Sequence, residues 1–101
     1  MATLSVTFGR HIGTPGAPIM DGDKARSFKL TMPATSGFAA VSGENVVRVV
    51  ASANCWVAIG TAPIAAIPTS STSSRTHYVG QGGSLELAVE TGEKVAVIAD
   101  A

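Results

Sequence analysis

Apolar and polar residues alternate in several short segments of this chain. Residues 2–9 and residues 27–32 each place an apolar side chain at every second position. A period of two buries one face of a β-strand, so both segments are expected to be strands. The inward-facing side chains are then Leu4, Val6 and Phe8 in the first segment and Phe28, Leu30 and Met32 in the second.

The longest apolar stretch runs from residue 45 to residue 66, and Arg48 and Asn54 interrupt it. A membrane-spanning helix needs about 20 mostly apolar residues, and these two polar residues inside it would cost several kcal/mol. We therefore expect no membrane segment here but two central strands, residues 45–51 and 55–60, joined by a tight turn. Valines on both sides of the first strand indicate that both faces of this pair are covered.

The C-terminal residues 84–100 are expected to form a β-hairpin connected through Thr91 and Gly92. Its inward-facing side chains are Leu85, Leu87, Val89, Val95 and Val97. No segment of the chain has a convincing apolar period of a helix. The pattern predicts an all-β fold, a single-domain β-sandwich over residues 1–101, jelly-roll-like, with about seven or eight short strands.

Glycine and proline divide the strand segments. Residues 9–25 hold four glycines and two prolines. No regular element is expected at this density, so we predict an extended arm or a long loop, of the kind that is functional or docks on something else. Two prolines exclude a central strand or a long helix from residues 61–68, and residues 69–76 are expected to form a solvated Ser/Thr-rich loop. Phe38 and Val41 are expected to cover a sheet edge.

Charged residues make up only 14% of the chain, and seven Lys and Arg balance seven Asp and Glu. A net charge near zero argues against binding to nucleic acid or to an anionic membrane surface. It also leaves little repulsion between copies, which favours a protein that assembles with its neighbours. A single cysteine forms no internal disulfide, and the N-terminal residues lack the pattern of a signal peptide, so we expect synthesis in a reducing cytosol.

Catalytic chemistry is not indicated by the residue pattern. A nucleophilic Cys55 would need a base, and the two candidates, His11 and His77, lie in or beside distant loops, so a buried structural cysteine is favoured. These three residues also lack the paired spacing of a zinc site. The acidic residues are expected in turns or on solvated strand faces: Asp21, Asp23, Glu44, Glu86, Glu90, Glu93 and Asp100. We therefore expect no enzyme and no cofactor.

Two arginines and two aromatic residues leave alternatives open. Arg48 in a valine-rich strand must reach the surface, pair with a carboxylate or contact a neighbouring subunit. Trp56, Tyr78 and Arg75 could form a small recognition patch of the kind found at interfaces. For Trp56, burial statistics favour the other interpretation, a place in the hydrophobic core.

Three segments carry a resemblance to a known group of proteins. They are Val47–Ala51 (VRVVA), Cys55–Ala65 (CWVAIGTAPIA) and, after a Ser/Thr/Gly-rich gap, Thr91–Ile98 (TGEKVAVI). Over this C-terminal half the chain resembles small virion structural proteins of tailed bacteriophages, of the head decoration or cement type. The shared motifs are patterns of strands and turns.

The resemblance implies a jelly-roll-like protein that binds the lattice of the major capsid protein and stabilises the head. It also implies a homo-oligomer, a trimer or a dimer, which is made in the host cytoplasm and located on the capsid surface of the virion. A Gly/Pro-rich arm is suited to crossing a subunit boundary and pairing with a neighbour's sheet edge. The residues expected at such contacts are Arg10, His11, Ile12, Pro15, Pro18, Ile19, Met20, Arg48, Arg75 and Tyr78.

Two other functions are alternatives. A carbohydrate-binding or adhesive module of a phage tail or fibre would need aromatic platforms beside polar side chains, and only 5% of the residues are aromatic. A small enzyme subunit whose active site is completed by another chain would need a poised histidine or a pair of acids. The composition and pattern therefore favour the virion structural protein.

Overall fold

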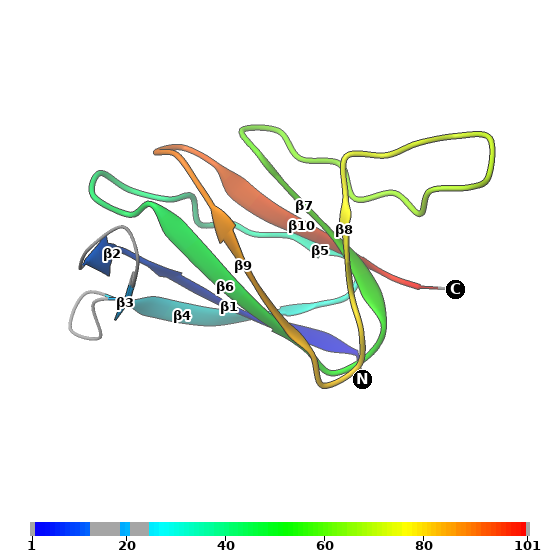
Figure 1. The fold of residues 1–101 in the computed structure, drawn as a ribbon, viewed down its shortest axis with the longest axis horizontal. Coiled ribbons are helices and arrows are strands. Elements are labelled where there is room, and N and C mark those ends of the chain that lie inside the picture. The colour runs from blue at the N-terminus through cyan, green and yellow to red at the C-terminus, as the bar shows by residue number, and fades with distance from the viewer. Residues whose placement is uncertain (1, 13–18, 21–24, 101) are drawn as a thin grey trace.

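The computed structural model describes residues 2–12, 19–20 and 25–100 (Figure 1). Within them the chain forms two four-stranded antiparallel sheets and no helix, which confirms the all-β prediction. The first sheet has the order β4-β1-β6-β9, with β4 Arg26–Thr31, β1 Thr3–Gly9, β6 Val46–Ala51 and β9 Ser84–Ala88. The second sheet has the order β5-β10-β7-β8, with β5 Ala34–Thr35, β10 Lys94–Ala99, β7 Cys55–Gly60 and β8 His77–Val79.

The inward faces of the two sheets meet in one hydrophobic core. The first sheet contributes Leu4, Val6 and Phe8, all fully buried, together with Val47 and Val49. The second sheet contributes Cys55, Val57, Val95 and Val97. The strand faces predicted from the period of two are therefore confirmed, because every second side chain of a strand points to the same face.

The predicted C-terminal hairpin is wrong. β9 pairs with β6 in the first sheet, whereas β10 pairs with β5 and β7 in the second. Leu85 and Leu87 approach the core from one side and Val95 and Val97 from the other. The short connection between the strands therefore crosses from one sheet to the other. Within it, Glu93 N–H donates to the carbonyl of Glu90 at 3.1 Å.

The predicted pair of central strands separates in the same way. Residues 52–54 form a turn, as expected, but they lead from β6 in one sheet to β7 in the other. The outer face of β6 is also not covered, because Arg48 and Val50 are exposed there. The turn at residues 52–54 therefore connects strands of different sheets, and β6 and β7 do not pair with each other.

The predicted arm contains a regular element after all. Within residues 9–25, β2 (His11–Ile12) pairs antiparallel with β3 (Ile19–Met20), and Gly9 is the last residue of β1. A two-stranded pair tolerates the surrounding glycines and prolines because they fall outside the paired residues. Phe38 packs on Phe28 of the edge strand β4, with ring centres 5.3 Å apart, although the side chains of Phe38 and Val41 both stay exposed.

Glu44 is not solvated as predicted but is buried beside Arg26 of β4. Arg26 Nε and Nη2 donate to the two carboxylate oxygens at 2.7 and 2.6 Å, and Val41 N–H donates to Oε1 at 2.8 Å. The hydrogen bonds from Arg26 lower the pKa of Glu44 below its usual value. The same guanidinium lies 5.6 Å from the ring centre of Phe8, so this ion pair closes one end of the core.

The turn before β9 requires two glycines. Gly82 has a φ of 76°, which L side chains rarely adopt, and a Cβ on Gly83 would lie 2.9 Å from the carbonyl oxygen of Gly80. That oxygen accepts the Gly83 N–H at 2.8 Å, so it cannot move without breaking the turn. Position 83 therefore requires glycine, because the backbone of Gly80 leaves no room for a side chain there.

We expect Gly83→Ala to lower the free energy of unfolding by about 1–3 kcal/mol, because the turn must shift to admit the methyl group. The measurement is urea denaturation of purified protein. Gly37→Ala is the matched control: nothing lies within 4 Å of its Cβ, so no loss is expected. Equal losses in the two variants would show that the turn at Gly83 is not tightly packed.

Candidate interaction surface

The outer face of the first sheet is polar. Serine and threonine side chains occupy it on β1 and β4, and Thr7 Oγ1 and Ser27 Oγ are 2.8 Å apart across these strands. Arg48 of β6 lies opposite Glu86 of β9, and its Nη2 donates to Glu86 Oε2 at 3.1 Å. Both side chains are exposed, so such a pair contributes at most about 1 kcal/mol.

Arg48 therefore takes two of the three roles considered for it: it reaches the surface and pairs with a carboxylate. It lies on a different sheet from Tyr78, which belongs to β8. The structure thus does not bring Arg48 together with Tyr78 and Arg75 in one patch.

The outer face of the second sheet carries an apolar row across three strands. Tyr78 of β8 lies opposite Trp56 of β7, which in turn lies opposite Ile98 of β10. The rings of Trp56 and Tyr78 pack edge to face with centres 5.1 Å apart, and Tyr78 is 47% exposed. Trp56 Nε1 donates to Asp100 Oδ1 at 3.1 Å, which satisfies the indole and fixes the ring.

The preferred prediction for Trp56, a place in the core, is wrong. Its neighbours Cys55 and Val57 point into the core, so the alternation of the strand directs Trp56 to the outer face. The ring is partly buried there, against Tyr78, and its polar atom lies at the surface. The alternative interpretation, a recognition patch with Tyr78, fits this position.

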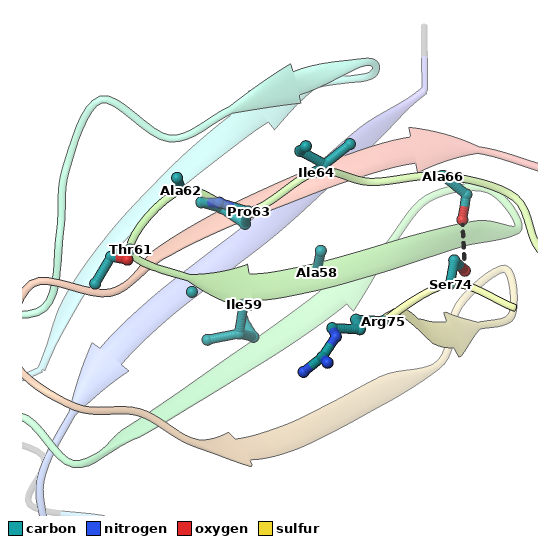
Figure 2. A pocket seen from close by; sticks show the side chains of 10 residues that line it. Ala58, Ile59, Thr61, Ala62, Pro63, Ile64, Ala66, Ser74 and Arg75 are labelled. Carbon is teal, nitrogen blue, oxygen red and sulfur yellow. Dashed lines mark hydrogen bonds between the residues drawn. The ribbon is translucent and has the colours of Figure 1, made fainter.

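The loop of residues 61–76 passes over the remaining part of this face (Figure 2). Beneath it, Ala58 and Ala96 lie opposite each other on β7 and β10 and are each only 2% exposed. Two methyl groups leave room for the chain to approach the sheet closely. Ile64, in the middle of the covering segment, is 80% exposed and is the most exposed large apolar side chain among the described residues.

A cavity of about 480 Å³ lies between this loop and β7 (Figure 2). Pro63, Ile64 and Ala66 line it from the loop, and Arg75 lies at its edge beside Ile59. A hydrogen bond joins the two sides of the loop at its base, where Ser74 Oγ donates to the carbonyl of Ala66 at 3.0 Å. Ile59 points to the core face of β7, and Arg75 lies on that side of the strand, whereas Trp56 and Tyr78 lie on the outer face, so Arg75 does not join their patch.

Most residues predicted at contacts in the arm fall into the β2–β3 pair or outside the described residues. His11, Ile12, Ile19 and Met20 belong to the pair, and Pro15 and Pro18 lie outside what the structure describes. Arg10 is exposed and lines a cavity of about 240 Å³ together with Arg26, Val41 and Glu44. Arg10 therefore lies beside the Arg26–Glu44 ion pair of the first sheet, whereas Trp56 and Tyr78 lie on the second.

Of the residues considered for chemistry, Cys55 and His77 lie in different environments, and the side chain of His11 falls outside what the structure describes. Cys55 is fully buried in the core, and burial raises the pKa of its thiol, which disfavours the nucleophilic thiolate. His77 lies on edge strand β8 with an exposed side chain. In the part of the chain that the structure describes, no group of three or more His, Cys, Asp or Glu residues is placed to hold a metal ion.

Ile64 was missed by the sequence analysis. Its signal was an apolar residue directly after Pro63, in a segment whose prolines exclude a central strand. An apolar residue in such a segment has no strand face to bury it. The same pattern therefore predicts that the side chain of Ile64 is exposed.

No protein-family model, no curated protein and no solved structure matches this chain. No helix of the described residues is long and apolar enough to cross a membrane. The two sheets differ in their outer faces: that of β4-β1-β6-β9 is polar, and that of β5-β10-β7-β8 carries an apolar row. This contrast is the feature from which a function can be inferred.

Proposed function

We propose that this chain is a non-enzymatic virion structural protein of a tailed bacteriophage, a decoration or cement protein that binds the major capsid protein lattice and stabilises the head. The observation that supports it most is the apolar outer face of β5-β10-β7-β8, with Tyr78 and Ile64 exposed on it. The chain as a whole carries no net charge, which suits a partner that is recognised by shape and apolar contact.

The chain connectivity supports the finer description of the fold as a jelly-roll-like β-sandwich. Successive strands alternate between the sheets, from β4 to β5, from β5 to β6, from β6 to β7 and again from β8 to β9 to β10. Such winding between two packed antiparallel sheets is typical of jelly rolls. The resemblance of residues 47–98 to phage decoration proteins points to the same fold.

In this proposal the protein is made in the host cytoplasm and binds the outside of the assembled shell. It needs no cofactor, because its contribution is binding energy alone. A protein that binds only the assembled shell stabilises it by mass action. Many copies on one lattice make individually modest contacts strong in sum.

The experiment is co-sedimentation of the purified protein with expanded shells assembled from major capsid proteins of tailed phages. We expect saturable binding, and we expect Tyr78→Ser and Ile64→Ser each to weaken it at least about tenfold, because each removes an apolar contact at the face. Val50→Ser is the matched control, since Val50 is also exposed but lies on the polar sheet. Absence of binding to all shells, or equal losses in the three variants, would contradict the proposal.

A carbohydrate-binding module is the second candidate, and the aromatic pair favours it. The exposed ring of Tyr78 lies near polar groups, since Trp56 donates to Asp100 and Asn54 Oδ1 accepts the Gln81 N–H at 2.8 Å. Aromatic rings beside polar side chains are what sugar sites require. Binding to a glycan array that Tyr78→Ser abolishes, without binding to shells, would select this function.

A further inference from the structure

Strand β9 is the most open edge of the two sheets. It lies last in the order β4-β1-β6-β9 and pairs along one side, with β6. Natural edges are blunted by short length, charge or proline. β5 has two residues and β8 has three, and β4 carries Arg26 and Lys29, whereas β9 has five residues, no proline and one charge.

The hydrogen-bond pattern shows which backbone groups of β9 point to this edge. Ala51 N–H donates to the carbonyl of Gly83 at 3.1 Å, and Val89 N–H donates to that of Asn45 at 3.1 Å. Because hydrogen-bonded positions alternate in an antiparallel pair, the odd-numbered residues between them bond to β6. The N–H and C=O groups of Ser84 and Ala88 therefore point away from β6.

The side chains of β9 are incompletely covered on the core side. Leu85 and Leu87 pack against the core but are only partly buried. On the other, outer face of the sheet, a cavity of about 200 Å³ is lined by Val46, Glu86 and Ala88. A further strand at this edge would bury more of both leucines and would hydrogen-bond with Ser84 and Ala88.

We propose that the strand at this edge is β9 of a second copy, paired antiparallel about a two-fold axis with Leu87 opposite Leu87 and Glu86 opposite Ala88. Charge excludes one competing register. Glu86 opposite Glu86 would place two carboxylates side by side, which is destabilising, whereas the chosen register places each beside a methyl group. The zero net charge of the chain leaves little repulsion between the copies.

The two-fold axis runs perpendicular to the sheets, so both apolar outer faces of the dimer point the same way. Binding of both faces to one shell rests on the proposed function; the pairing of β9 does not. A dimer of this shape would bind a lattice through two faces at once, which raises its effective affinity.

The test is light scattering of the purified chain across a concentration series, with two variants of exposed Ala88. We expect the wild type to reach twice the mass of one chain. Ala88→Glu is expected to weaken the dimer about tenfold, because it faces Glu86 of the second copy, whereas Ala88→Lys is expected to keep or strengthen it. Circular dichroism checks that both variants fold as the wild type does.

A monomer at every concentration, or equal effects of the two Ala88 variants, would overturn the pairing. So would a dimer that Tyr78→Ser abolishes and Ala88→Glu leaves intact, because the copies would then meet through the apolar face. Shell binding is measured separately. A monomer that binds shells overturns only the pairing, and a β9 dimer that ignores shells overturns only the proposed function.

Discussion

Phe8→Ala is expected to lower the free energy of unfolding by about 3–5 kcal/mol, the range for removing a buried aromatic side chain. Phe8 is fully buried in β1. Its ring centre lies 5.7 Å from that of Phe28, and the Arg26 guanidinium covers its face. The variant therefore loses these contacts and leaves a cavity in the core, and urea denaturation measures the loss.

Phe38→Ala is the matched control for this prediction. Phe38 also packs on Phe28, with ring centres 5.3 Å apart, but it is 56% exposed. Its truncation is expected to cost less than about 1 kcal/mol, since exposed substitutions have small effects. Similar losses at the two positions would mean that the first β-strand does not bury its apolar face as described.

Glu44→Gln is expected to lower the free energy of unfolding at pH 7 by about 2 kcal/mol, because it leaves the charged Arg26 without its carboxylate. The loss is smaller than for a fully buried pair, since the Arg26 side chain is 40% exposed and solvent screens it. Urea denaturation across a pH series is the measurement.

The pH dependence follows from the lowered pKa of Glu44. Its contribution to stability is fully present above the unfolded value of about 4.3 and is lost as the pH falls through the lower folded pKa, because the unfolded state binds the proton first. The difference between wild type and Glu44→Gln should therefore shrink in acid. Glu86→Gln, in the exposed pair with Arg48, should show a loss below about 1 kcal/mol; a loss as large as at Glu44 would contradict the account.

The alternation of side chains predicted which face of each strand is buried, because that property depends on neighbouring residues alone. Leu4, Val6 and Phe8 lie in the core as expected, and so do Val95 and Val97. The alternation does not indicate which other strand each strand pairs with. A hairpin and a crossing between sheets bury the same side chains, so the C-terminal strands were assigned to the wrong neighbours.

The candidate surface was partly predictable for a related reason. Trp56 and Tyr78 were recognised as a possible pair, but only the sheet order places them in opposite positions. Glu44 was missed as a buried acid because its partner Arg26 lies 18 residues away. Contacts between distant residues depend on the folded arrangement, and local patterns do not specify them.

Hydrogen bonds at the base of the 61–76 loop hold the chain in place, so the conformation of its tip does not affect the sheet. Ser74 and Thr76 both donate to the carbonyl of Ala66, so the chain is held there before it enters β8. Residues 69–73, which form the tip beyond these two hydrogen bonds, are exposed. Lengthening the tip then costs only loop-closure entropy, about 0.6 kcal/mol for each doubling, so a foreign peptide inserted there would be displayed on the protein without disturbing the fold.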